Sequence, residues 1–147
     1  MTERFDTPIL LLIFNRPDTT ERVFNLLKEI KPSKLFISGD GARSNKAGEN
    51  EKVEKTREVV QSIDWDCDVK YNFSDINLGC KKGVSSGISW FFENVTAGII
   101  IEDDVLPHKS FFGFCNGMLE RYKDNEKVMH IGGANFQDGI KRGESSY

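Results

Sequence analysis

Three adjacent carboxylates, Glu102, Asp103 and Asp104, directly follow an apolar run that has the character of a buried strand. Carboxylates this close repel one another, so they cost free energy unless a cation shares the space. Alternate side chains of an extended segment point to opposite sides, which predicts that Glu102 and Asp104 share one side. Hard oxygen ligands suit Mn²⁺ or Mg²⁺, whose shell is normally completed by water and ligand phosphates. The alternative is that the acidic residues and Pro107 cap the helix that follows, near Lys109.

Three further charged residues, Arg16, Asp40 and Lys82, lie in or beside loops marked by glycine or proline. Arg16 lies at a predicted helix N terminus, where a guanidinium and free backbone N–H groups favour the same anion; an exposed, unengaged arginine is the alternative. Asp40, between two glycines, can accept hydrogen bonds from a base or ribose, or can bond its own turn. Lys82, with Lys81, can neutralise a diphosphate, or both lysines can simply be solvated at the start of a helix.

The apolar pattern predicts the elements that position these residues. Residues 9–14 are apolar at every position, as in a strand buried on both faces, and a helix follows from Pro17 until Pro32 ends it. The same reasoning predicts strands at 35–38, 69–73, 98–101 and 128–131, and helices at about 50–63, 84–92 and 111–122.

Strand and helix therefore alternate five times. This pattern predicts an α/β fold: an open, mostly parallel, Rossmann-like sheet with right-handed crossovers and helices on both faces. Ligands of such sheets bind outside the carboxyl ends of the strands. We therefore expect the site to form from the loops that carry Arg16, Asp40, Lys82 and the acidic trio, together with residues 132–139.

Composition excludes several classes of protein. The 147 residues suit one domain, and a formal charge of −3 gives no electrostatic footprint for nucleic acid. The longest apolar run, residues 8–14, is far shorter than the roughly 20 residues of a membrane helix, and no signal peptide precedes it. We expect a cytoplasmic protein without a transmembrane segment, whose three cysteines are reduced core thiols.

Four segments together resemble one known family. They are Ile-Phe-Asn-Arg-Pro at 13–17, Ile-Ser-Gly-Asp-Gly at 37–41, Asn-Leu-Gly at 77–79 and Ile-Ile-Ile-Glu-Asp-Asp-Val-Leu-Pro at 99–107. In this order they resemble the nucleotide-sugar-binding half of a GT-A-fold glycosyltransferase. The nearest relatives by motif are N-acetylglucosaminyltransferase I-like enzymes and bacterial family-2-like sugar transferases. The resemblance covers roughly residues 8–139.

The resemblance implies a role for each matching residue. Asp104 matches the metal ligand, Glu102 and Asp103 match residues that contact the donor sugar and ribose, Asp40 matches the uracil-contacting aspartate, and Arg16 the arginine near the diphosphate. The implied cofactor is Mn²⁺ or Mg²⁺, which bridges the donor phosphates and stabilises the leaving diphosphate. The implied donor is a nucleotide-sugar, with a UDP-sugar favoured, and the acceptor is a glycan or other hydroxyl compound.

The resemblance also implies domain limits. Residues 1–139 form the nucleotide-sugar-binding domain, and 140–147 form a flexible tail or mark a truncation point. Inverting transfer needs a general base, but Asp138 and Glu144 lie in a terminal segment that no element fixes, so no base is nominated. A missing C-terminal half or a homo-oligomer would supply the acceptor side, and the chain alone should bind donor and metal but at most hydrolyse the donor slowly.

Three alternatives remain at this stage. A nucleotidyltransferase of related fold usually has a glycine-rich loop with a basic residue after the first strand, and Asn15-Arg16-Pro17 lacks it. A receiver domain has a pair of acidic residues at the same place, which this loop also lacks. A non-catalytic nucleotide-sugar-binding module would keep the fold and lose transfer.

Overall fold

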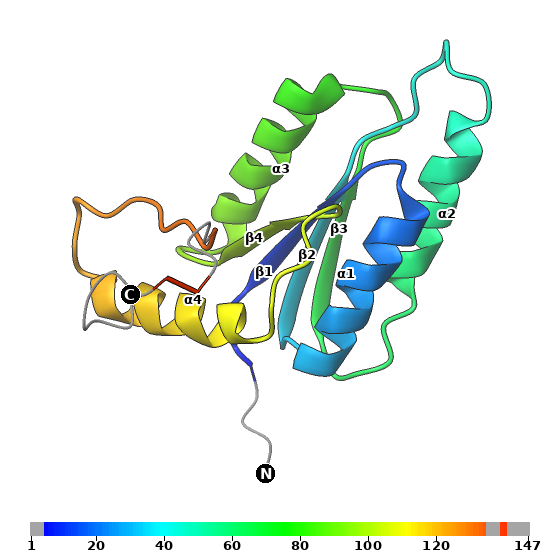
Figure 1. The fold of residues 1–147 in the computed structure, drawn as a ribbon. Coiled ribbons are helices and arrows are strands. Elements are labelled where there is room, and N and C mark those ends of the chain that lie inside the picture. The colour runs from blue at the N-terminus through cyan, green and yellow to red at the C-terminus, as the bar shows by residue number, and fades with distance from the viewer. Residues whose placement is uncertain (1–4, 135–138, 141–147) are drawn as a thin grey trace.

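The computed structural model describes residues 5–134 and 139–140. Its centre is a four-stranded, all-parallel sheet in the order β3-β2-β1-β4 (Figure 1). The strands are β1 (Ile9–Ile13), β2 (Lys34–Gly39), β3 (Asp68–Phe73) and β4 (Ile99–Glu102). All five residues of β1 are buried, because this strand has neighbours on both sides and helices over both faces.

The described residues form four helices: α1 (Pro17–Ile30), α2 (Glu49–Gln61), α3 (Gly79–Asn94) and α4 (Ser110–Tyr122). Figure 1 shows α1 and α2 side by side on one face and α3 on the other. The two-residue period of β1 explains this division, since Ile9, Leu11 and Ile13 pack into one apolar cluster and Leu10 and Leu12 into the other. The predicted open parallel sheet with helices on both faces is confirmed.

Helix α3 approaches the sheet closely through a glycine. A Cβ atom on Gly87 would lie 2.7 Å from Ser38 Oγ and 3.0 Å from Leu12 Cδ2, so no larger residue fits there without movement. Four residues earlier, a Cβ on Gly83 would lie 3.3 Å from Asp40 Oδ2. This close packing places the first turns of α3 directly beside the carboxyl ends of β1 and β2.

The predicted strand at 128–131 is wrong. Within the described residues this segment pairs with no strand, Val128 N–H donates to the Asn125 carbonyl oxygen at 3.0 Å, and Met129 is 95% exposed. The crossover rule also disfavours a parallel strand here, because Phe112 of α4 belongs to the apolar cluster on the α1 and α2 face. Because β1 already occupies the inner side of β4, a parallel strand reached through α4 would lie beyond β4 by a left-handed crossover, which folds almost never adopt.

The cysteines differ from expectation at one position. Cys67 and Cys115 are part-buried, but Cys80 is exposed, so the prediction of a core thiol is wrong there; all three are free. In the part of the chain that the structure describes, no helix combines the length and the apolar character needed to cross a membrane. Asp138, Glu144 and residues 141–147 of the predicted tail lie outside the described residues.

Candidate functional site

The loops after β1 and β4 meet at the point where the order of the sheet reverses. From β1 the chain adds β2 and β3 on one side and then returns to place β4 on the other. In open α/β sheets this switch point leaves a crevice at the carboxyl ends of the strands, where ligands bind. Arg16 follows β1 here, and Asp103 and Asp104 follow β4.

Asp103 is the buried member of the acidic trio, with 3% of its surface exposed. Its carboxylate accepts hydrogen bonds from Phe14 N–H at 3.0 Å, from Arg16 Nη1 at 2.9 Å and from the buried Thr20 hydroxyl at 3.5 Å. Burial raises the pKa of Asp103, and the Phe14 N–H and the Arg16 cation oppose that rise. Both carboxylate oxygens thus face protein donors at the start of α1.

Arg16 supplies the counter-charge of this loop. Its Nη1 bridges Asp103 Oδ1 at 2.9 Å and Asp104 Oδ2 at 2.8 Å. Glu102 and Asp104 are exposed while Asp103 is buried, which confirms the alternation expected from the sequence. The capping alternative is wrong, because α4 begins at Ser110 and no acidic side chain caps it.

The carboxylates at this edge fit a sparse metal site rather than a closed one. Across residues 5–134 and 139–140 no group of three or more His, Cys, Asp or Glu side chains is arranged to hold a metal ion. Asp104 is 42% exposed, and among the residues that the structure describes only its Oδ2 has a partner, Arg16. Glu102 is exposed two residues earlier. Such a donor set suits Mg²⁺ or Mn²⁺ only when water and ligand phosphates complete the shell.

Asp40, at the end of β2, is bound entirely by the protein. Oδ1 accepts the N–H groups of Gly41 and Leu78 at 2.9 and 2.8 Å, and Oδ2 accepts Gly79 N–H at 2.9 Å and Asn77 Nδ2 at 3.0 Å. A carboxylate has about four acceptor positions, and these four donors fill them. These hydrogen bonds connect the end of β2 to the start of α3. Contact of Asp40 with a nucleoside base remains a prediction, and it requires one of the four protein N–H donors to leave.

Lys82 lies in the first turns of α3, near Asp40. Its side chain is exposed, and its ammonium has no hydrogen-bond or ion-pair partner among the residues the structure describes. A solvated lysine and a lysine awaiting an anion both fit this position, so its role toward a diphosphate stays a prediction.

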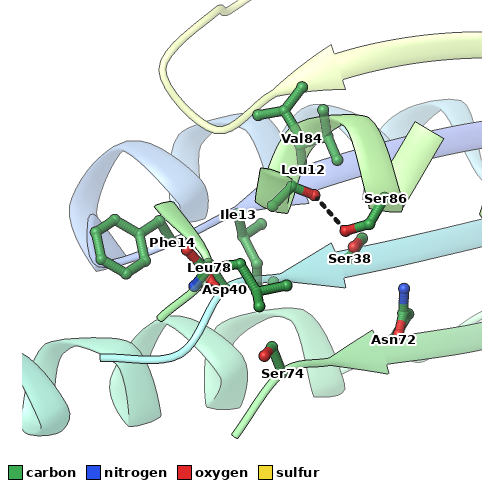
Figure 2. A pocket seen from close by; sticks show the side chains of 12 residues that line it. Leu12, Ile13, Phe14, Ser38, Asp40, Asn72, Ser74, Leu78, Val84 and Ser86 are labelled. Carbon is green, nitrogen blue, oxygen red and sulfur yellow. Dashed lines mark hydrogen bonds between the residues drawn. The ribbon is translucent and has the colours of Figure 1, made fainter. Parts of the chain in front are cut away.

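A pocket of about 340 Å³ opens between the strand ends and α3 (Figure 2). Its lining includes Leu12 of β1 and Phe14, which follows β1. Ser38 and Asp40 at the end of β2 and Val84 of α3 also line it. The volume lies at the lower end of the range for small-molecule sites. Apolar side chains with a few hydroxyl and amide groups around them suit a flat, partly polar ring.

Comparison of the chain with protein-family models, with curated proteins and with solved structures gives no match.

The site includes residues that no local pattern identifies. Glu49, the first residue of α2, is 5% exposed and accepts a hydrogen bond from Asn15 Nδ2 at 2.9 Å, while Arg43 encloses its carboxylate. Both charged residues lie in or beside a polar stretch that the sequence predicts as loop. The only sequence signal is the acidic residue in the first turn of a helix, which is common and does not single out Glu49.

Proposed function

We propose that this chain is the nucleotide-sugar-binding domain of a metal-dependent glycosyltransferase of the GT-A type. The main supporting observation is that Arg16, Asp103 and Asp104 converge at the topological switch point. None of the three lines the pocket, but Phe14, in the same loop as Arg16, does. The order of the motifs along the sequence resembles that of GT-A glycosyltransferases, which supports a nucleotide-sugar as the donor. The place at the strand ends thus supports a ligand site, and the resemblance supports the kind of ligand.

Each residue then has a definite task toward the donor. The nucleoside base enters the pocket beside Asp40, and the diphosphate lies over the loops that carry Arg16 and Lys82. A divalent cation held by Asp104, with Glu102 beside it, would neutralise the diphosphate as it leaves. Asp103 fixes the guanidinium of Arg16 and the turn at Phe14, so it positions the site from below.

Calorimetry with UDP and several nucleotide-sugars, with Mn²⁺ or with EDTA, tests the proposal. We expect measurable binding with Mn²⁺ and at least tenfold weaker binding with EDTA. Asp104→Asn should lose most of this metal dependence and keep the fold, because the side chain is 42% exposed. Asp124→Asn, an exposed acid just after α4, is the control. Equal nucleotide affinity with and without metal would refute the assignment.

The same samples separate the alternatives. Slow release of nucleoside diphosphate and free sugar from a nucleotide-sugar supports a transferase in which water takes the place of the acceptor. Binding without release supports a non-catalytic nucleotide-sugar-binding module. Release of pyrophosphate from a nucleoside triphosphate supports a nucleotidyltransferase, which the glycine-free loop at 14–17 disfavours.

A further inference from the structure

A second arginine lies at the same edge of the sheet and has no role in the proposal above. Arg43, in the loop between β2 and α2, is held by the buried carboxylate of Glu49. Arg43 N–H donates to Glu49 Oε2 at 2.7 Å, Nε donates to the same oxygen at 2.9 Å, and Nη2 pairs with Oε1. Backbone and side chain of Arg43 are thus fixed by one carboxylate.

This arrangement leaves part of the guanidinium free. The Arg43 side chain is 45% exposed, and its Nη1 has no partner within residues 5–134 and 139–140. The guanidinium carbon lies 5.7 Å from the centre of the Phe14 ring, and Phe14 lines the pocket. Arg43 does not itself line the pocket, but its guanidinium, which Glu49 holds, lies next to a side chain that does.

The loop after β1 links this arginine to the other one. Phe14 N–H binds Asp103, Asn15 Nδ2 binds Glu49, and Arg16 Nη1 binds Asp103 and Asp104. Arg16 thereby faces two carboxylates and leaves its surroundings net negative. An anionic ligand needs a further donor here, and Arg43, which is balanced by one carboxylate, has an N–H group to give.

We propose that Arg43 contacts a phosphate of the ligand that enters this pocket, and that Glu49 is the positioning residue that orients its guanidinium. The ligand class, a nucleoside diphosphate, depends on the proposed function; the anion contact of Arg43 does not. The chemistry is hydrogen bonding of a fixed N–H group to a phosphate oxygen, with no covalent step.

Arg43→Gln and Arg43→Lys test the contact, with binding of UDP, uridine and inorganic pyrophosphate measured by calorimetry. We expect tenfold or greater loss of affinity for UDP and pyrophosphate in both variants, and uridine affinity within twofold of the parent protein. Arg43→Lys keeps the charge beside Glu49 and loses the free Nη1. Arg22→Gln, an exposed arginine of α1, is the matched control and should change nothing.

The outcomes separate this inference from the proposed function. Unchanged UDP affinity in both Arg43 variants, or equal loss for UDP and uridine, overturns the contact and leaves the proposed function standing. Arg43-dependent binding of pyrophosphate without any uridine or UDP selectivity supports the contact while the proposed function fails. Absence of binding by every ligand to the parent protein overturns both.

Glu49→Gln tests the positioning role. The amide keeps the shape of the side chain and an acceptor for Asn15, but it loses the charge that holds Arg43. We expect UDP affinity to fall, and the double variant Glu49→Gln/Arg43→Gln to bind UDP no more weakly than Arg43→Gln alone. Additive losses would overturn positioning. Circular dichroism reports whether Glu49→Gln lowers the folded fraction. If it does, the single Arg43 variants, which keep Glu49, still test the phosphate contact.

Discussion

At the scale of single residues, the loop Phe14-Asn15-Arg16 connects three parts of the sheet edge. Its members bind Asp103 and Asp104 after β4 and Glu49 at the start of α2. Arg16 and Arg43 are therefore both paired with carboxylates before any ligand arrives, although Arg16 faces two carboxylates and Arg43 only one. A ligand that binds at Arg16 has to exchange contacts with an existing ion pair.

Removing the Arg16 cation should expose the cost of burying Asp103. We expect Arg16→Gln to lower the free energy of unfolding by about 1–2 kcal/mol at pH 7. This is less than the loss of a fully buried ion pair, because the Arg16 side chain is half exposed. The loss should shrink as the pH falls, because Asp103, whose pKa burial already raises and whose pKa would rise further without Arg16, then becomes protonated. Urea unfolding at several pH values measures this; a loss that stays constant with pH would contradict it.

Glu49 should give the opposite pH dependence. The Arg43 hydrogen bond is the main cause that lowers the pKa of Glu49 to about 2, against about 4.3 in an unfolded chain. The folded state therefore gains stability above the unfolded pKa and loses it as pH falls from about 4.3 toward 2.

The measurement is the difference in unfolding free energy between the parent protein and Glu49→Gln. We expect it to be largest above pH 5 and to vanish near pH 2. Glu51→Gln, an exposed acid two residues further along the first turn of α2, should show no such trend. A difference that grows on acidification would refute the role assigned to the ion pair.

At the scale of elements, most of the fold was predictable because the information is local. A run such as residues 9–13 is apolar at every position only when both faces are buried, and α1 has its apolar side chains at helical spacing between Pro17 and Pro32. The 128–131 segment is apolar at three of its four positions, with His130 between, and Met129 is 95% exposed. A strand needs a neighbouring strand edge, and the position of α4, which no local pattern contains, disfavours a parallel place beyond β4.

The candidate site was predictable only in part, for a similar reason. Strand ends direct Arg16, Asp40 and the acidic trio to one edge, and the resemblance assigns roles to them. The partners of these residues depend on distances between loops far apart in sequence, such as the 87 positions between Arg16 and Asp103. Glu49 and Arg43 belong to a polar segment without periodicity, so only the structure reveals them.

Close packing of α3 gives a test at the level of one helix. Gly87→Ala should lower the free energy of unfolding by about 1–3 kcal/mol, because the new Cβ would lie 2.7 Å from Ser38 Oγ. Gly113→Ala, in α4, should raise the free energy of unfolding by about 0.5–1 kcal/mol through helix propensity, because no described residue beyond its own helix backbone and chain neighbours comes within 4 Å of the new Cβ. Urea denaturation compares the two; stabilisation by Gly87→Ala would show that α3 does not pack this closely.

At the scale of the whole molecule, ligand binding should stabilise the fold, since the site joins loops from β1, β2 and β4. UDP with Mn²⁺ at about 100 times its dissociation constant contributes roughly 2.7 kcal/mol, or a rise of about 5–10 °C in Tm for a chain of this size. Differential scanning fluorimetry measures the shift. EDTA and Asp104→Asn should each remove most of it, and a Tm that is insensitive to UDP and Mn²⁺ would contradict the site.

The position of β1 has a consequence for how the protein is made. Its residues Ile9–Leu12 pair on one side with β2, which follows soon after, and on the other with β4, which the ribosome adds ninety residues later. At about 5–20 residues per second this second edge of β1 waits several seconds for its partner. During that interval the most apolar strand of the nascent chain has an unpaired edge, which makes it a natural target for chaperones. Slowing translation between β1 and β4 should therefore reduce the yield of folded protein more than slowing it after β4.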